Sequence, residues 1–407
     1  MGNKIIWIFN SGEPIPYLTG ARPMRTSCII NEFALRGHKV HWWTSRFNHQ
    51  TKDYYKIVNN HEIINSVSYH FSWGLRYKKN NSVFRYISYK LSAIITFFDI
   101  LKSHEKMPDL FYFSIPSYDL SALMSIYCRI KKIPYIIDVR DAWPTTFEHV
   151  LSSPLFAILK PLLLIDYFFL RLSIKGAAKV HASSPQLAAW VKELVPSSLV
   201  ETHIHGYPSP FATLELAKNE LINKPSAPGL NVVFVGTLGE MYDLELIIKL
   251  TKMCQKFQDI KFQVIGSGPK LQRFIRENSS LNNLKIFGRV ESVELRKLLI
   301  DADIGLLFYK SNDFFPNKLF EYLAYGLTII SNIKNKDIDA ISSSYIHCSS
   351  DINNLYKKII FYYENKAILK RNSEAMLEIY YDRFCSKKVY TKLCEETLSI
   401  FGGDNGN

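Results

Sequence analysis

The most constraining feature of the sequence is the stretch at 303–331, which predicts a strand, a loop, a short helix and a second strand. Residues 303–309 form a short apolar run that is typical of a buried parallel strand, and residues 327–330 form another. Between them, residues 318–324 predict a helix that ends at Gly326, because a left-handed glycine commonly terminates a helix. Ligands of open α/β sheets bind at the carboxyl ends of the strands, so this loop and helix start predict a binding site for an anion.

The polar side chains of this stretch favour a phosphorylated sugar as the ligand. Asp313 and Glu321 lie eight residues apart, with Lys318 between them. Carboxylates accept hydrogen bonds from sugar hydroxyls, whereas an ammonium group and the main-chain amides of residues 315–319 suit phosphate oxygens. Pro316 donates no amide hydrogen. The structural alternative stays open, in which Asp313 only caps the helix and Glu321 lies on a solvated helix face.

Length and composition predict two soluble domains. The chain has 407 residues, of which 47% are hydrophobic and 21% charged, so each of two domains can bury its own core. The six cysteines form no CxxC pair and no cluster with histidine at metal spacing, which favours core thiols in a reducing compartment and no metal site. The first residues lead directly into a strand and lack the features of a signal peptide, so we expect a cytoplasmic protein.

The net charge of +13 is concentrated in the first half of the chain. Residues 1–200 hold 24 basic and 13 acidic side chains, a net charge of +11, and the remaining residues carry +2. This asymmetry predicts an anionic partner for the first half, which could be nucleic acid, an acidic membrane surface or a polyanionic substrate.

The beginning of the chain predicts a βαβ unit with a ligand-binding loop. Residues 5–9 and 39–43 are apolar strands, and residues 21–35 between them predict a helix. Gly20 precedes this helix, where a glycine allows close approach of a ligand, and Arg22 and Arg25 are spaced to share one helix face. Neither a dinucleotide fingerprint nor a Walker sequence is present. A solvated helix face is the alternative for both arginines.

Charged residues at the end of a buried strand indicate a second part of the site. Residues 135–139 predict a core strand that leads directly into Arg140 and Asp141. The carboxyl end of a buried strand suits a binding site better than it suits packing. A structural ion pair is the alternative.

Two apolar segments with basic residues predict contact with a membrane surface. Residues 155–174 contain Lys160, Asp166 and Arg171, which a spanning helix would have to bury, so we expect either a core helix or an amphipathic surface helix. Residues 76–90, at the start of a predicted helix over 83–101, form the second segment.

Three glycine turns predict where a nucleotide lies in the second half. Strands at 231–235, 262–265 and 284–287 each lead into a glycine-containing turn, and parallel strands bring such turns to one edge of the sheet. We expect a domain at 1–216, a polar linker at 217–230, a second domain at 231–385 and a C-terminal helical segment at 386–407.

These features together resemble the family 4 glycosyltransferases, and the sequence around Glu321 is similar to bacterial enzymes that assemble O-antigen and capsule repeat units. The resemblance covers nearly the whole chain, including the form R-D-x-W-P at Arg140 and Asp141. It implies the GT-B fold, with two Rossmann-like domains facing a cleft and the last helix crossing back to the first domain. It also implies a retaining hexosyltransferase that needs no metal or cofactor. The acceptor implied is a saccharide on a polyprenyl diphosphate, reached from the inner face of the plasma membrane.

The resemblance assigns roles to individual residues. Asp313, Glu321, Arg140 and Asp141 take catalytic roles, with Asp313 accepting from the sugar hydroxyls and Glu321 from the ribose. Nucleotide-sugar binding is assigned to Gly20, Arg22, Arg25, Gly236, Thr237, Gly266, Gly288, Arg289, Val290, Phe315, Pro316, Asn317, Lys318, Leu319 and Glu321.

One departure from the family pattern concerns the diphosphate. The family usually has an arginine and, five residues later, a lysine in the first glycine turn, but Thr237 and Tyr242 occupy these positions. Another cation must therefore face the leaving group, and Lys318 is the first candidate, followed by Arg22, Arg25 and Arg140. Two other functions stay open: a nucleotide-sugar epimerase of the same fold, and a basic nucleic-acid-binding protein.

Overall fold

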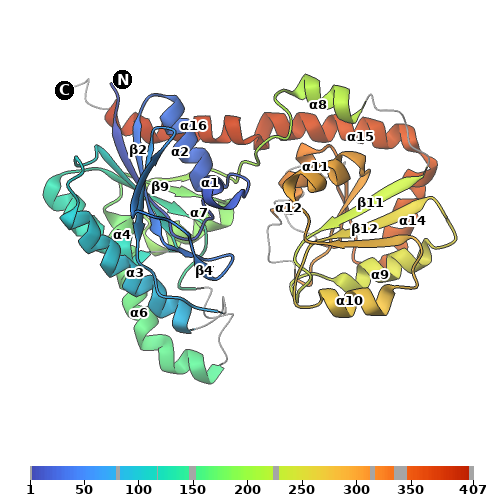
Figure 1. Ribbon diagram of the computed structural model, residues 1–407, viewed down its shortest axis with the longest axis horizontal. Coiled ribbons are helices and arrows are strands. Elements are labelled where there is room, and N and C mark those ends of the chain that lie inside the picture. Colours follow the sequence, from blue (N-terminus) through green and yellow to red (C-terminus); the bar gives the residue numbers. More distant parts are fainter. Residues whose placement is uncertain are drawn as a thin grey trace. The chain divides into compact units, whose positions relative to one another are not determined.

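The computed structural model describes residues 2–78, 83–116, 118–145, 153–222, 229–311, 317–333 and 346–402. The chain divides into two compact units, of which the first comprises Met1–His205 with Val389–Asn407 and the second comprises Gly206–Lys388. Each unit has its own mostly parallel sheet with helices on its faces (Figure 1).

The first unit is organised around an eight-stranded sheet in the order β10-β9-β8-β7-β1-β2-β6-β5. All pairs are parallel except β5 with β6. The strands are β1 (Ile5–Phe9), β2 (Lys39–Ser45), β5 (His61–Ile64), β6 (Val67–Ser72), β7 (Leu110–Ile115), β8 (Tyr135–Val139), β9 (Lys179–Ala182) and β10 (Val200–Thr202), with a separate antiparallel pair of β3 (Phe47–Asn48) and β4 (Asp53–Tyr54). The helices are α1 (Pro16–Thr19), α2 (Arg25–Leu35), α3 (Val83–Lys102), α4 (Tyr118–Lys131), α6 (Ser153–Lys175), α7 (Pro185–Leu194) and α16 (Ser386–Leu398), followed by the 3₁₀ turn η2 (Ser399–Phe401).

Alternation along the strands divides the apolar side chains of this unit between two cores. Trp7 and Phe9 of β1 face the core that α3, α4, α6 and α7 cover, whereas Ile6 and Ile8 face the core under α2 and α16. The second core contains Tyr390 and other residues of α16, so the end of the chain is part of the first unit. This is the predicted return of the last helix.

The second unit has a six-stranded, fully parallel sheet in the order β13-β12-β11-β14-β15-β16. The strands are β11 (Leu230–Val235), β12 (Ile260–Ile265), β13 (Leu284–Gly288), β14 (Ile304–Leu307), β15 (Thr328–Ser331) and β16 (Ile346–Cys348). The helices are α8 (Leu214–Leu221), α9 (Leu244–Met253), α10 (Leu271–Asn278), α11 (Ser292–Asp301), α12 (Lys318–Ala324), α14 (Ile352–Glu364) and α15 (Lys366–Ile379), followed by the π-helical turn η1 (Tyr380–Phe384). The strand order reverses between β11 and β14, so the topological switch point of this sheet lies at their carboxyl ends.

Three predicted boundaries differ from the structure. The linker expected at 217–230 is wrong at its start, because α8 contacts α15 and buries Ala217 and Leu221 in the second unit. The chain crosses between the units at His205 and Gly206 instead. The helix expected from residue 21 begins at Arg25, after the separate turn α1, which ends at the left-handed Gly20. The linker was wrong because a polar segment was predicted to be irregular although it carries α8, and the helix start was wrong because residues 21–24 were predicted to be helical although they connect α1 and α2.

The six cysteines are free thiols; Cys128, Cys254 and Cys394 are buried as expected, whereas Cys28, Cys348 and Cys385 are half-buried. None of the described helices combines the length and apolar character that crossing a bilayer requires.

Candidate active site

Three glycine turns form a continuous backbone surface at the carboxyl edge of the second sheet. The amide of Gly236, after β11, donates to Ile265 O at 3.0 Å, and the amide of Leu238 donates to Ser267 O at 3.0 Å. The amide of Gly266, after β12, donates to Gly288 O at 2.7 Å. These bonds connect the ends of three neighbouring strands and hold the turns at the positions that the sequence predicts.

Two of these positions accept no residue other than glycine. Gly266 has a φ of +145°, and a Cβ on it would lie 1.8 Å from Gly236 O. A Cβ on Gly268 would lie 2.4 Å from Leu238 O. Because the obstacles are backbone atoms, they cannot rotate away, and the turns after β11 and β12 depend on bare glycine backbone for their close approach.

Uncharged aromatic rings occupy the switch point. Asp243 N donates to Phe308 O at 3.1 Å and Lys310 N donates to Met241 O at 3.0 Å, which ties the loop after β11 to the end of β14. The ring of Tyr242 lies 4.6 Å from that of Tyr309 and packs beside Gly236. Thr237, in contrast, is exposed. The structure therefore gives Tyr242 a packing role where the family usually has a lysine.

Lys270 and Lys310 lie at this edge and were missed by sequence reasoning. Lys270 contacts Oε1 of Glu240 at 2.8 Å, and Lys310 contacts Oε2 of the same residue at 3.5 Å. Together with Tyr242 they line one end of an open groove along α9 and α10. Neither lysine belongs to a recognisable motif, so only the fold brings them together.

Helix α12 holds the acidic residue of the predicted motif. Glu321 is only 2% exposed, and its two oxygens have different partners. Lys318 donates to Oε2 at 2.5 Å, and the hydroxyl of Tyr207 donates to Oε1 at 2.7 Å. This corrects the alternative of a solvated helix face. A carboxylate oxygen has two lone pairs, so one hydrogen bond from the protein does not by itself prevent it from accepting another.

Tyr207 is the second residue that the sequence did not indicate. Its amide donates to Phe384 O at 2.9 Å, and its carbonyl accepts from Ser386 N and from the hydroxyl of Tyr380. The backbone of Tyr207 is therefore fixed to η1 and the start of α16, and its hydroxyl is aimed at Glu321. Its partner lies 114 residues away in sequence, which explains why no local pattern revealed it.

The remaining predicted residues of the second unit fall into three groups. Arg289 and Asn317 are exposed, whereas Gly236, Gly266, Gly288 and Val290 are half-buried at the edge. The side chain of Leu319 is fully buried in the core, so only its backbone is available to a ligand. Asp313, Phe315 and Pro316 lie outside the described residues.

The first unit carries a buried ion network at the carboxyl end of β8. The guanidinium of Arg25 contacts Asp138 at 2.7 Å and donates to His203 O at 2.7 Å, and its side chain is 1% exposed. Arg140 contacts Asp138 at 2.7 Å and also pairs with Glu13. Burial alone would raise the pKa of Asp138, but the charges of Arg25 and Arg140 outweigh it and hold that pKa well below its usual range.

This network changes two of the expected roles. Arg25 is buried and saturated by protein acceptors, so it is a structural residue here and not the exposed ligand contact that the sequence suggested. Arg22 lies in the segment before α2 and is exposed, so the two arginines do not share a face. Asp141 and Gly20 are exposed. Nη2 of Arg140 is buried without a hydrogen-bond partner in the part of the chain that the structure describes, which leaves it able to bind an anion.

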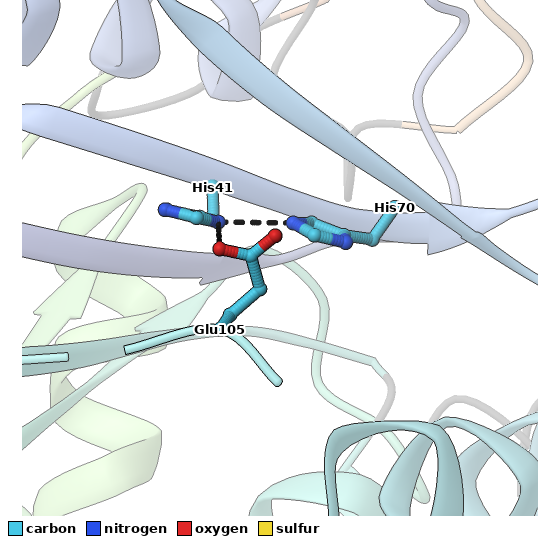
Figure 2. A group of neighbouring side chains, drawn as sticks. All are labelled: His41, His70 and Glu105. Carbon is cyan, nitrogen blue, oxygen red and sulfur yellow. Dashed lines mark hydrogen bonds and ion pairs between the residues drawn. The ribbon is translucent and has the colours of Figure 1, made fainter. Parts of the chain in front are cut away.

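A group of histidines lies at the opposite, amino-terminal part of the first sheet. Figure 2 shows His41 and His70 lying end to end, with Nδ1 and Nε2 2.9 Å apart, and Glu105 beside them. His61 stacks on His70 with ring centroids 4.5 Å apart. Because the two facing nitrogens already share a hydrogen bond, this group is satisfied without a metal ion.

Comparisons with known proteins agree with this geometry. Residues 229–365 match the family model for glycosyl transferases group 1. A comparison with curated protein sequences gives no match. Among solved structures, sucrose-phosphate synthase from Thermosynechococcus elongatus is 13% identical with a TM-score of 0.67, and the alignment covers 99% of this chain and 100% of that one.

Two further structures are similar over the whole chain. HepE from Anabaena in complex with UDP is 14% identical with a TM-score of 0.62, covering 97% of this chain and 99% of that one. A glycosyltransferase from Rickettsia africae is 14% identical with a TM-score of 0.61, covering all of both chains. At these identities the likeness establishes the fold, and it confirms the predicted pair of Rossmann-like domains.

Proposed function

We propose that this glycosyltransferase of the GT-B fold, with a group 1 domain in its second unit, moves a sugar from a nucleotide diphosphate sugar to a polyprenyl diphosphate-linked saccharide. The reaction would retain the anomeric configuration, need no metal ion and contribute to a surface polysaccharide such as O-antigen or capsule. The observation that carries the proposal is the single edge of the second sheet, which combines three bare glycine turns with the carboxylate of Glu321.

The donor fits this edge from base to sugar. The turn at 288–290 would take the base, and the turns at Gly236 and Gly266 would take the diphosphate on their backbone amides. Glu321, held by Tyr207 and Lys318, would accept from the ribose hydroxyls. A carboxylate whose two oxygens are both held by the protein loses little conformational entropy on binding, so it positions the donor well.

Charge at the leaving group is the main catalytic requirement. As the acceptor oxygen bonds to the anomeric carbon, the bond to the diphosphate breaks and negative charge grows on the departing nucleoside diphosphate. Lys318 is one cation available for this charge, and Lys270 and Lys310 add two others at the same edge. These lysines would supply the positive charge that Thr237 and Tyr242 lack. In the first unit, Arg140 and Asp141 would serve the acceptor side.

The first unit presents an apolar face that suits a membrane-borne acceptor. One stripe of α3 is exposed at intervals of three and four residues, and α6 adds a second exposed stripe. The residues are Phe84, Ile87, Leu91, Ile94, Phe98 and Leu101 on α3, and Leu162, Leu164, Ile165 and Phe168 on α6. Asp166 of α6 joins the helices by accepting from Lys90 at 2.6 Å and from Tyr86 at 2.6 Å.

This face and the positive charge of the first half favour an anionic membrane. Arg85 and Lys90, which the sequence placed at the basic edge, are engaged inside the protein, with Arg85 over Trp143 and Lys90 bridging Asp119 and Asp166. Lys160 and Arg171 are exposed on α6 and offer basic side chains on the same helix as part of the apolar face. A peripheral position on the inner face of the plasma membrane follows from the proposal.

We expect the chain to float with vesicles that contain anionic lipid, and to bind them less well as salt increases. The double variant Phe98→Glu with Phe168→Glu should lower the bound fraction at least tenfold, because it places charges in the apolar face; these side chains are 52% and 63% exposed. The matched control is Val58→Glu with Leu199→Glu, which adds the same charge at exposed positions away from both helices. Equal flotation of the two double variants, or no flotation of the parent chain, would rule out this surface.

The function itself is tested by transfer. The chain is incubated with a panel of nucleotide diphosphate sugars and a polyprenyl diphosphate-linked saccharide, and the products are separated by mass and by anomeric configuration. We expect one donor to give a lengthened lipid-linked saccharide with the donor's configuration. Conversion of a donor when no acceptor is present would identify an epimerase, and an inverted product would contradict retention.

A further inference from the structure

A second group of histidines and carboxylates lies inside the first unit and is only partly satisfied by hydrogen bonds. It comprises His181 of β9, Glu201 of β10, His203 just after β10 and Glu396 of α16. Nε2 of His181, Nε2 of His203 and Oε2 of Glu201 lie within 4.8 Å of one another. Nε2 of His181 makes no hydrogen bond in the described part of the chain, whereas Nε2 of His203 lies 2.8 Å from Oε2 of Glu396. Both imidazoles are at least 95% buried, with exposures of 0% and 5%. Buried polar atoms without partners are rare and require an explanation.

The strand geometry explains why these side chains converge. His181 and Glu201 are directly opposite in the parallel pair of β9 and β10. His203 lies two residues beyond Glu201, on the same side, and its amide donates to Ala182 O at 2.8 Å. Glu396 reaches the group from α16, with Oε2 2.8 Å from Nε2 of His203.

The distances between the facing atoms fit a tetrahedral ion. Oε2 of Glu201 lies 3.7 Å from Nε2 of His181 and 3.7 Å from Nε2 of His203. Bonds of about 2.0–2.1 Å from zinc to nitrogen or oxygen place neighbouring ligands about 3.3 Å apart in a tetrahedron. The observed separations of 2.8 and 3.7 Å lie on both sides of this value.

The outer atoms of three of the four ligands have partners that orient them. Nδ1 of His181 lies 3.2 Å from the hydroxyl of Tyr112. Oε1 of Glu201 accepts from Lys179 at 2.7 Å, and Oε1 of Glu396 lies 3.7 Å from Lys392. His181 and Glu201 thus each have one outer atom with a partner and one inner atom turned to the group, and Glu396 turns Oε2 to Nε2 of His203, as expected for metal ligands that are held by further partners.

The composition of the group also suits a cation, because two carboxylates face two buried imidazoles.

We propose that His181, His203, Glu201 and Glu396 bind one divalent transition-metal ion, for which zinc is the first choice, and that this ion fastens α16 to β9 and β10. Two imidazoles and two carboxylates form a neutral site with such an ion, and zinc favours four nitrogen and oxygen ligands. The carboxylate side chains are 33% and 30% exposed, which gives the ion a path from solvent. The role of the ion is structural and independent of the transfer reaction. It joins α16, near the end of the chain, to the edge strand β10, which is only three residues long.

The test uses the full chain, stripped with a chelator and titrated with zinc chloride, with bound metal counted by elemental analysis and affinity measured by calorimetry. We expect one tightly bound zinc and a rise in melting temperature with zinc, because a ligand that binds only the folded state stabilises it. Glu396→Gln should weaken zinc binding at least tenfold and remove the rise in melting temperature. It alters a partly exposed carboxylate, so folding is expected to survive.

Two control variants locate the ion. Glu395→Gln changes the adjacent residue of α16, which pairs with Arg36 and is 58% exposed, and should bind zinc like the parent chain. His41→Gln changes the hydrogen-bonded group of Figure 2 and should also retain the zinc. A parent chain that binds no zinc, equal binding by Glu396→Gln, or loss of zinc in His41→Gln with retention in Glu396→Gln would each overturn the proposal.

Discussion

Replacing Glu321 with glutamine is expected to lower kcat/KM for transfer by about 10- to 150-fold while the chain still folds. The glutamine oxygen can still accept from Tyr207, but the charge that pairs with Lys318 and that would accept from the ribose is lost. A hydrogen bond to a charged group is worth about 1.5–3 kcal/mol, which corresponds to that range of rates. The loss should appear mainly in KM for the donor, measured from initial rates at saturating acceptor.

The variant Tyr207→Phe separates the two roles of Glu321. It removes one hydrogen bond to Glu321 and leaves the carboxylate charge in place. We expect a smaller loss than in Glu321→Gln, because Lys318 still holds the carboxylate. Equal losses in the two variants would mean that Glu321 acts only through its bond to Tyr207. A folded Glu321→Gln variant with the parent's kcat/KM would remove Glu321 from the site.

Replacing Arg25 with alanine is expected to lower the free energy of unfolding of the first unit by about 3–5 kcal/mol. Arg25 is 3% exposed and makes its ion pair with the fully buried Asp138, so its removal leaves a buried charge with less compensation. Its bond to His203 O is lost as well. Such a loss is a large part of the 5–15 kcal/mol that stabilises most proteins.

Tryptophan fluorescence reports this transition selectively, because all six tryptophans lie before residue 191 and hence in the first unit. The control is Arg22→Ala, since Arg22 is exposed and should change the urea midpoint little. The pKa of Asp138 is lowered in the folded state. Its ion pair with Arg25 therefore stabilises the folded state fully above the unfolded pKa of about 3.9, and this stabilisation is lost as the pH falls below that value. Equal midpoints for Arg25→Ala and the parent chain would contradict the structural role.

The features that the sequence predicted correctly are those with local patterns. Buried parallel strands appear as short apolar runs, so the runs before Gly236, Gly266 and Gly288 located three strands and their turns. The glycines marked the edge because their conformations or neighbours exclude a side chain, as at Gly266.

The features that the sequence could not give depend on contacts between distant residues. The bond from Tyr207 to Glu321 joins positions 114 apart, and Lys270 meets Lys310 only through Glu240. Arg25 had the spacing of a surface arginine but is buried, because Asp138 lies beneath it on a strand that is 113 residues away. Local spacing predicts which side chains share a face, but it does not predict what covers that face.

The most direct test of the proposed donor site is hydrogen–deuterium exchange of the full chain with and without UDP, GDP, ADP and dTDP. We expect at least one nucleotide to protect the amides at 236–241, 266–270, 288–290 and 317–322, which the fold brings to one edge of the second sheet. Glu321→Gln should weaken that protection at the same nucleotide concentration. Protection confined to the first unit, or none with any of the four nucleotides, would contradict the assignment of the donor site.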